Sequence, residues 1–534
     1  MKRIRIKNLR SLTDTNNIDI KPITVLVGKN SIGKSTFLRT FPLLKQTMVT
    51  NRSEPILWYS PELVDFGNFS ESVNKKNKNE TIDLFYEFDL IIDDFLSAPF
   101  YSANIPWDVV IGLRNFNRKN ENREVNTKLM ISVKEGNISK IEISIFNYNY
   151  VISIDDKGKV IKLRVNTTES PIKVVLNQPD KYTSMELIPK IYIPIESSKK
   201  GIGVDYSEKM MSYFFKELDK IKGKQIGDKT FRNFMKDITF GTEEDFFRSL
   251  MKQINRFPSV QKQYNKLNSN EAEELFSNLY DYYGLGCVNL VILVINNYFS
   301  EYFDNCQYIA PIRATAQRNY RSQGLSIETI TPQGENVPML LDSMSDNEKR
   351  DWNNWTEERF GIKFIVTKHE TNISLKLEKN SEEINLADTG FGYSQLLPIL
   401  LYAWKTTKHN SKKYFWTSDK RRKINTLVIE QPELHLHPAL QANVLDVFIE
   451  LIKFYSEELE FNIIMETHSE TIITRLGQHV AISEGSKLSE KINIVVFNEI
   501  GGRLEINQSH FSKEGYLEKW PIDFFLPDLE GILR

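Results

Sequence analysis

The chain has 534 residues, of which 40% are apolar and 26% are charged, and its formal net charge is −1. This length predicts roughly three domains with a sizeable core. The near-neutral charge excludes a whole-molecule field that attracts nucleic acid, so any such binding must come from a local patch.

Two cysteines, Cys287 and Cys306, are too few for a disulfide framework or a zinc site, which is typical of a reducing cytosol. The N-terminal residues lack the apolar core of a signal peptide. The longest apolar run, at 288–295, is too short to span a bilayer. We therefore expect a cytoplasmic protein that does not enter a membrane.

Alternating apolar residues at 4–9 predict a strand, and the apolar run at 23–27 predicts a buried one. Directly after it, residues 28–36 read Gly-Lys-Asn-Ser-Ile-Gly-Lys-Ser-Thr, which fits the phosphate-binding pattern G-x-x-x-x-G-K-[ST]. The glycines allow a tight turn whose N–H groups point at phosphate oxygens, and a helix start follows. Lys34 would reach the β- and γ-phosphates of a nucleotide, and the Ser35 hydroxyl would bind Mg²⁺.

Short strands are predicted between residues 81 and 175. Ile141, Ile143 and Ile145 alternate with polar residues, and a turn at 155–158 precedes a second alternating run. We expect an antiparallel meander in which the second run places three apolar residues on one face: Ile161, Leu163 and Val165.

From residue 206 to 303 the apolar spacing becomes helical, which predicts an insertion of roughly three to five helices. The residues that follow this spacing are Met211, Phe214, Phe215 and Leu218, then Phe247, Leu250, Met251 and Ile254, then Ala272, Leu275, Phe276 and Leu279. The heptad pattern does not persist, so we do not expect a long coiled-coil arm.

Three short apolar runs in the last third, at 426–429, 462–465 and 492–497, predict parallel core strands. Glu430 follows the first run, and a carboxylate at a strand end beside the phosphate loop can hold Mg²⁺ directly or through water. His468 follows the second run, where it could hydrogen-bond a γ-phosphate. The alternative for His468 is a structural histidine whose hydrogen bonds are satisfied.

The glycine-containing segment 387–397 precedes an apolar helix. Its glycines, Gly390 and Gly392, leave backbone N–H groups accessible at a helix start, which predicts a second anion-binding site. A plain helix cap is the alternative.

Taken in this order, these segments resemble the ABC-type ATPases of the SMC, RecF and OLD group. The matching segments are 6–11 (first strand and turn), 28–36 (Walker A loop), 387–397 (signature motif), 430–438 (Walker B and D-loop) and 466–470 (switch-histidine motif). Four segments further resemble the defence-associated ATPases, of which the Septu subunit PtuA is one example: 310–318, 388–392, 430–438 and 520–525.

The resemblance implies an α/β fold: an ABC-type ATPase head with a mixed, largely parallel sheet carrying the phosphate loop, an antiparallel β meander and an inserted helical subdomain. It places the N-terminal half of the head at 1–200, the insertion at 201–305 and the C-terminal half at 306–534. Two such heads dimerise head to tail, so it also implies a homodimer or larger assembly in which one copy closes over ATP bound to the other.

The resemblance also assigns roles to individual residues. ATP contacts are implied for Gly28, Asn30, Ser31, Gly33, Lys34, Ser35 and Thr36, for Arg10 and Ser11 near the phosphates or base, and for Gly390 and Gly392 in trans. Mg²⁺ would be held by Ser35 and Glu430. The catalytic candidates are Glu430, Gln431, Glu433 and His468.

Gln431 departs from the family pattern, which usually has a second carboxylate at this position. An amide can position a water molecule but cannot accept its proton. Losing a general base costs roughly 10²–10⁴ in rate, although phosphoryl transfer needs less base help and Ras-type enzymes use a glutamine. We predict slow hydrolysis and a long-lived closed dimer, with Glu433 as a substitute base if the loop bends inward.

Many OLD relatives carry a nuclease module after the ATPase, but residues 469–534 read as core strands and a tail. The resemblance therefore suggests that a separate His-Asn-His-type nuclease is the partner. A basic stretch from Lys405 to Lys423 with interleaved Tyr414, Phe415 and Trp416 could contact DNA. A solvated lysine-rich loop is the alternative.

The sequence thus predicts a slow, dimeric ATPase that gates or scaffolds a partner effector in antiphage defence. Two alternatives remain: a DNA-repair clamp of the RecF or SMC type, and a nucleotide-locked scaffold without turnover.

Overall fold

The computed structural model describes residues 1–76, 80–91, 124–156, 158–176, 186–194, 204–222, 238–322, 329–413, 424–455, 460–483 and 487–518. The chain divides into two compact units. Unit 1 comprises Met1–Leu9, Gln46–Trp58 and Phe66–Glu301, and unit 2 comprises Arg10–Lys45, Tyr59–Asp65 and Tyr302–Arg534. Each unit therefore gathers segments that are distant in the sequence.

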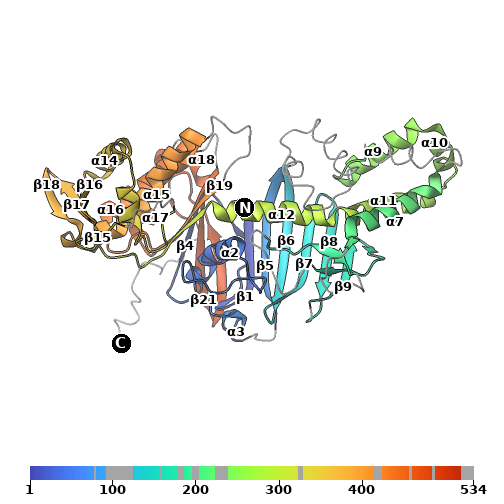
Figure 1. The fold of residues 1–534 in the computed structure, drawn as a ribbon, viewed down its shortest axis with the longest axis horizontal. Helices are drawn as coiled ribbons and strands as arrows, with labels where there is room; N and C mark the ends of the chain where they lie inside the picture. The colour runs from blue at the N-terminus through green and yellow to red at the C-terminus, as the bar shows by residue number, and fades with distance from the viewer. Residues whose placement is uncertain are drawn as a thin grey trace. The chain divides into compact units, whose positions relative to one another are not determined.

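Unit 1 contains an antiparallel sheet with the strand order β10-β9-β8-β7-β6-β5-β1 (Figure 1). Its strands are β1 (Arg3–Leu9), β5 (Ile82–Ile91), β6 (Glu124–Lys134), β7 (Asn137–Ile145), β8 (Tyr148–Ile154), β9 (Val160–Val165) and β10 (Thr168–Glu169). Every second residue of β5 is buried, as expected for a sheet with one face against a core. The predicted antiparallel meander is confirmed.

The predicted inward face of β9 is wrong at one position. Ile161 is 64% exposed, whereas Val160 is buried together with Leu163 and Val165. The pairing of β8 with β9 shifts register at Ser153 and Ile154. A register irregularity moves a side chain to the other face of a sheet, so simple alternation fails here.

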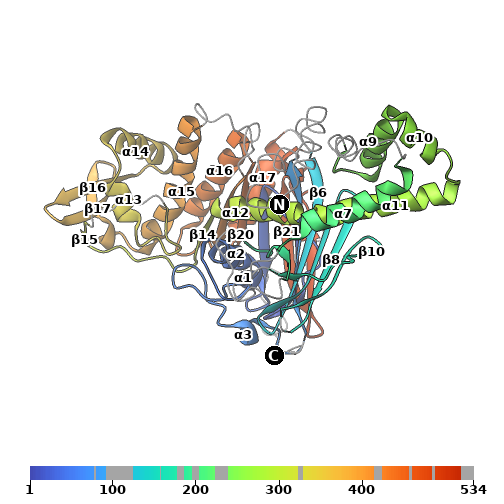
Figure 2. The same ribbon diagram turned by 45° about the vertical axis from the view of Figure 1, so that its right-hand side comes forward.

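Helices follow in unit 1 where the apolar spacing predicts them. They are α7 (Tyr206–Leu218), η1 (Asp219–Ile221), α9 (Glu243–Arg256), α10 (Pro258–Tyr264) and α11 (Ser269–Gly286), and α12 (Val288–Asp304) begins here. Helices α7 and α11 lie side by side (Figure 2). Among the described residues no single helix is long and apolar enough to cross a membrane; α11 and α12 meet that test only as a pair bent by 49°.

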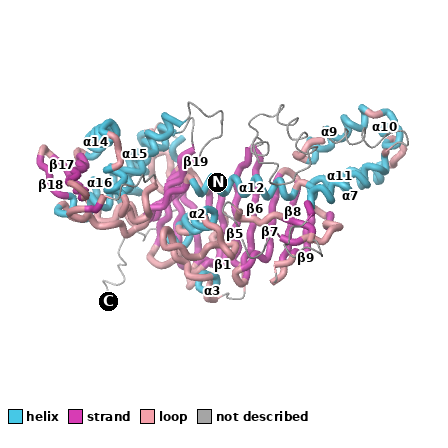
Figure 3. The backbone as a smooth tube through the Cα atoms, viewed as in Figure 1, coloured by secondary structure: helices cyan, strands magenta, loops and turns pink. Residues whose placement is uncertain are grey.

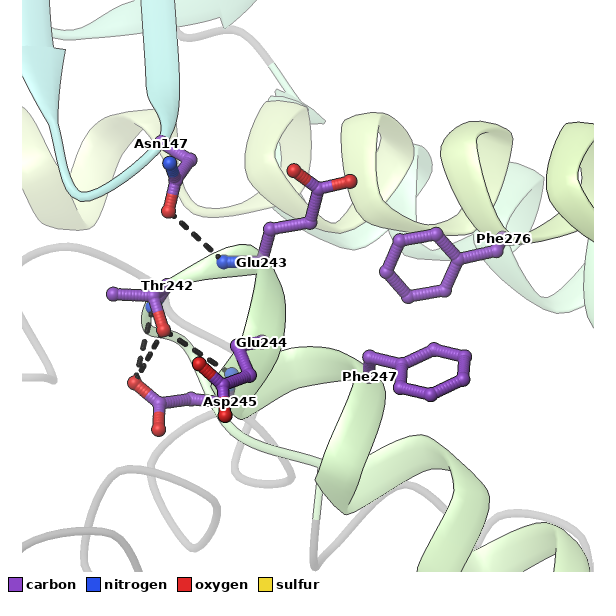
Figure 4. Close-up of a pocket in the computed structure, with 7 residues that line it drawn as sticks. All are labelled: Asn147, Thr242, Glu243, Glu244, Asp245, Phe247 and Phe276. Atoms are coloured by element: carbon purple, nitrogen blue, oxygen red, sulfur yellow. Dashed lines mark hydrogen bonds between the residues drawn. The ribbon is translucent and has the colours of Figure 1, made fainter.

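The start of α9 shows how local residues set a helix boundary (Figure 4). The Thr242 hydroxyl accepts from the Asp245 N–H, and the Asp245 carboxylate accepts from the Thr242 N–H, which forms a capping box. The predicted apolar face is wrong at Phe247, which is 43% exposed and meets Phe276 edge-on, whereas the adjacent Phe246 is fully buried.

Smaller elements complete unit 1. They are α3 (Phe69–Ser72) and an antiparallel sheet of β11 (Val175–Leu176), β12 (Ile191–Ile193) and β13 (Val204–Asp205).

Unit 2 contains a sheet with the order β14-β19-β20-β4-β21-β22. Its strands are β14 (Cys306–Ile309), β19 (Ile424–Glu430), β20 (Glu460–Glu466), β4 (Ile23–Gly28), β21 (Ile492–Ile500) and β22 (Arg503–Ser509). All neighbouring strands are parallel except β21 and β22. The three predicted parallel core strands are confirmed, and the predicted α/β class holds.

Helices and a second sheet accompany these strands in unit 2 (Figure 3). The helices are α1 (Lys34–Leu38), α13 (Val337–Asp342), α14 (Asp346–Phe360), α15 (Phe391–Lys413), α16 (Pro438–Tyr455), α17 (Glu470–Ile482) and α18 (Lys487–Glu490), and α2 (Thr40–Val49) begins here. The short elements are β2 (Leu12–Asp14), β3 (Ile18–Asp19) and η2 (Leu386–Asp388). The second sheet comprises β15 (Tyr320–Arg321), β16 (Lys363–His369), β17 (Asn372–Lys379) and β18 (Glu382–Asn385).

Candidate nucleotide-binding site

The loop between β4 and α1 has the backbone shape that a phosphate cradle requires. Gly28 and Gly33 have φ angles of 148° and 111°. A Cβ on Gly33 would lie 2.5 Å from the Leu12 side chain and 2.9 Å from the Ser11 hydroxyl, so only glycine fits. This close approach also places Ser11 beside the loop. Asn30 and Ser31 are exposed on it, and Ser35 and Thr36 are half-buried.

Lys34 is almost fully buried at the first position of α1. Its Nζ donates to the carbonyl oxygens of Gly28 at 2.9 Å and Lys29 at 2.6 Å. The same Nζ lies 3.7 Å from Glu466 Oε1. Burial lowers the pKa of Lys34, and the neighbouring Glu466 carboxylate opposes that shift. The Lys34 ammonium group therefore bonds to carbonyl oxygens at the start of its own loop.

Glu466 is the residue that the sequence reasoning missed. It ends β20, lies opposite Glu430 of β19 and Leu26 of β4 in the parallel register, and is 4% exposed. Its Oε2 accepts a 2.6 Å hydrogen bond from the Ser35 hydroxyl. Burial raises the pKa of Glu466, while Ser35 and Lys34 favour its charged form. The sequence could have identified Glu466, because it ends an apolar strand just as Glu430 does.

Glu430 is also buried, but other side chains occupy both of its oxygens. Arg39 forms a bidentate pair with it, at 2.7 Å from Nε to Oε1 and 2.9 Å from Nη2 to Oε2. Tyr308, on β14, donates its hydroxyl to Oε1 at 2.5 Å. The predicted pair of Mg²⁺ ligands was Ser35 and Glu430. In the structure the Ser35 hydroxyl bonds to Glu466, and Glu430 bonds to Arg39 and Tyr308.

The turn after β19 contains the other predicted catalytic residues. Gln431 has a φ of 45°, which is unusual for a residue with a side chain, and its N–H donates to the Glu466 carbonyl at 2.8 Å. Glu433 accepts a 2.7 Å hydrogen bond from the backbone N–H of His468. Burial raises the pKa of Glu433 and lowers the pKa of His468, which Lys34 lowers further. Glu433 therefore positions the His468 backbone in this structure.

The predicted signature segment begins α15. Gly390 has a φ of 78° with open space where a Cβ would stand, and the next residue, Phe391, is 57% exposed. A Cβ on Gly392 would lie 3.0 Å from the His435 carbonyl oxygen, so this segment packs on the turn that follows Glu430. The Phe391 ring lies 5.7 Å from the His435 ring, between centroids, on that same turn.

Two further sequence predictions concern Arg10, the neighbour of Ser11, and the basic stretch. Arg10 has a φ of 50° and donates through Nη2 to the Asp65 carbonyl at 3.0 Å. The segments 414–423 and 520–525, which include most of the proposed DNA-binding stretch and one family motif, lie outside the described residues. The DNA-binding hypothesis stays a prediction.

The site suits Mg²⁺ with a phosphate ligand better than a metal held by protein alone. Within the described part of the chain, no group of three or more His, Cys, Asp or Glu residues could hold a metal ion. Ser35 and Glu466 instead supply a hydroxyl and a carboxylate, which are oxygen donors that Mg²⁺ prefers when phosphates complete its shell. The Glu430 carboxylate is the register neighbour of Glu466, but its oxygens bond to Arg39 and Tyr308.

Comparisons with known proteins identify one family and two distantly similar solved structures. Residues 1–473 match the family model described as AAA ATPase domain. The SMC head domain from Thermotoga maritima has a TM-score of 0.32 and 9% identity over 95% of this chain and 97% of that one. The recombination mediator RecF, solved as its RecF-ATPrS form, has a TM-score of 0.29 and 12% identity over the same shares. No curated protein matches at a significant level.

Proposed function

Because this chain belongs to the AAA ATPase family, we propose that it binds ATP with Mg²⁺ and hydrolyses it slowly. The loop N–H groups and Lys34 would hold the phosphates. Ser35 and Glu466 would hold Mg²⁺, with Glu430 as a further carboxylate that reaches the metal directly or through water. Bound Mg²⁺ would neutralise charge that develops on the phosphates during hydrolysis.

One observation carries this proposal: Lys34, Ser35 and Glu466 converge at the carboxyl ends of the adjacent parallel strands β4 and β20. Ligands of α/β sheets bind at this edge. A bound triphosphate would replace the present partners of the Lys34 ammonium group, and Mg²⁺ would bind the Ser35 and Glu466 oxygens that now bond to each other. The contacts within the chain therefore mark the positions where phosphate and metal would bind.

Calorimetric titration with Mg²⁺-ATP tests the binding step. We expect Lys34→Ala to weaken binding by at least about 100-fold, since it removes a charge-assisted contact from a buried site. Lys487→Ala, at an exposed position of α18, is the matched control and should bind like the unmodified protein. Equal affinity of the two variants would refute the site.

We further propose that two copies dimerise head to tail around ATP, with Gly390 and Gly392 contacting nucleotide in trans. The support is the open space at Gly390 and the exposure of Phe391. Mass measurement with and without Mg²⁺-ATP tests the dimer, and phosphate release separates slow turnover from a locked scaffold.

The cellular role that we propose is a cytoplasmic switch for a separate nuclease in antiphage defence. The sequence motifs support this proposal, and co-purification with and without ATP tests it. A DNA-repair clamp is the rival function, and salt-dependent DNA binding without a nuclease partner would favour it.

A further inference from the structure

Arg313 contacts two segments of unit 2, the turn that follows β19 and the start of α15. It follows β14 and is 2% exposed. Its Nη2 donates to the carbonyl oxygens of Glu430, at 2.9 Å, and Gln431, at 3.4 Å. The guanidinium therefore holds the backbone where β19 ends and the turn 431–437 begins. This turn contains the predicted catalytic residues Gln431 and Glu433 and is called the catalytic turn below.

The backbone of Arg313 is tied to the start of α15. The Arg313 N–H donates to Gln395 Oε1 at 3.2 Å, and Gln395 Nε2 donates back to the Arg313 carbonyl at 3.0 Å. Gln395 is 3% exposed and lies one turn beyond the signature glycines. A reciprocal amide pair of this kind fixes both distance and orientation, so the two segments cannot shift independently without breaking it.

The backbone that Arg313 binds is strained at Gln431. Gln431 has the left-handed φ of 45° noted above, and its conformation persists because neighbours over-determine it. Arg313 binds its carbonyl oxygen, and the Glu466 carbonyl accepts its N–H. Removing one of these contacts is expected to let the turn relax and redirect the Gln431 amide.

The Arg313 guanidinium also has hydrogen-bond donors that it does not use. Among the described residues, Nε and Nη1 of Arg313 have no hydrogen-bond partner. The Glu433 and Glu430 carboxylates are nonetheless close enough to act on Arg313 electrostatically. A buried cation with unused donors beside a carboxylate can exchange partners, which is the kind of bistable element that coupling between sites requires.

We propose that Arg313 is a positioning residue that couples the signature segment to the catalytic turn of the same chain. This inference rests on the proposed function in one respect: the nucleotide bound by a second copy would be what displaces the start of α15. Displacement would pass through Gln395 and Arg313 to the carbonyls of Glu430 and Gln431, and so align Gln431 only when the dimer is closed.

Gln395→Met tests the coupling because it keeps the length of the side chain and removes the amide. In the nucleotide-free protein, hydrogen exchange of the backbone at 430–437 should rise about tenfold, as expected when a buried hydrogen-bonded pair is lost. The affinity for Mg²⁺-ATP should stay within about twofold, while kcat falls about tenfold or more. Thr407→Val is the control, because among the described residues its hydroxyl bonds locally on the same helix, to the Trp404 carbonyl.

Arg313→Lys separates geometry from charge. Lysine keeps the positive charge but lacks the planar fork, so we expect it to reproduce the loss of kcat rather than restore activity. Full activity of Arg313→Lys would overturn the positioning role. If Gln395→Met unfolds, Gln395→Asn keeps both amide groups on a side chain that is one methylene shorter and should show the same exchange change in a weaker form.

The outcomes distinguish this proposal from the proposed function. Unchanged exchange at 430–437 in both Gln395 variants would overturn the coupling even where ATP-dependent dimerisation is observed. Faster exchange at 430–437 without any ATP-dependent dimer would support the coupling and refute the proposed dimer.

Discussion

Ser35 and Glu466 are separated by 431 positions in the sequence, yet the Ser35 hydroxyl donates a 2.6 Å hydrogen bond to the Glu466 carboxylate. Lys34, next to Ser35, lies 3.7 Å from the other oxygen of the same carboxylate. One acidic side chain therefore engages both residues that the phosphate loop would use for a nucleotide and its metal. Glu466 thus balances the charge of Lys34 within the chain. A bound triphosphate would have to compete with it for Lys34, whereas a bound Mg²⁺ would use it as a ligand.

Glu466→Gln should change how ATP binding depends on Mg²⁺. Without the metal, we expect ATP to bind about tenfold more tightly, because the repulsion between this carboxylate and the triphosphate is removed. With the metal, the affinity gain that Mg²⁺ brings should shrink, since an amide is a weaker ligand than a carboxylate. Calorimetry at zero and saturating Mg²⁺ measures both effects.

Glu499→Gln serves as the control for this experiment, because Glu499 is exposed near the end of β21. If Glu466→Gln leaves the Mg²⁺ dependence unchanged, the metal depends on Glu430 instead.

Gln431→Glu should accelerate hydrolysis. A carboxylate at this position can accept the proton of the attacking water, and a missing general base accounts for roughly 10²–10⁴ in rate. We expect at least about a tenfold rise in phosphate release at saturating ATP. The fold should tolerate the change, because glutamate and glutamine share the same backbone strain at φ 45°. An unaltered rate would place the base at another residue.

Phe391→Ala should weaken ATP-dependent self-association without destabilising the monomer. Its ring is 57% exposed, so little buried area is lost within the chain. Sedimentation with Mg²⁺-ATP should show less dimer for Phe391→Ala than for the unmodified protein, and the two proteins should melt at the same temperature. Ile482→Ala, at a position that is 79% exposed on α17, is the matched control and should dimerise normally. Normal dimerisation of Phe391→Ala would remove this surface from the interface.

Asp281→Asn should have a pH-dependent effect on stability. Burial raises the pKa of Asp281, while hydrogen bonds from Thr168 and Asn166 oppose that shift. A carboxyl group whose pKa is raised on folding contributes stability below its unfolded pKa of about 3.9, and that contribution is lost as pH rises through the folded value. Denaturant unfolding of both proteins between about pH 4 and pH 8 should therefore favour Asp281→Asn increasingly as pH rises. A constant difference would contradict the raised pKa.

Much of the fold could be predicted from local patterns. Apolar alternation predicted the antiparallel sheet of unit 1, and the short apolar runs predicted β19, β20 and β21, because burial on one or two faces leaves its mark on neighbouring residues. The same reasoning failed at Ile161, where a register shift interrupts the alternation.

The sequence alone determined the phosphate loop, because its glycine positions and its lysine and serine act within a few residues of one another. Only the tertiary structure decided which carboxylate meets Ser35, since β20 lies between β19 and β4 in the sheet. That order brings Glu466 to Ser35 and leaves Glu430 to Arg39 and Tyr308. The order of the strands and the side chain that meets Ser35 arise from packing between segments hundreds of residues apart. No local sequence pattern shows whether Glu430 or Glu466 will lie beside Ser35.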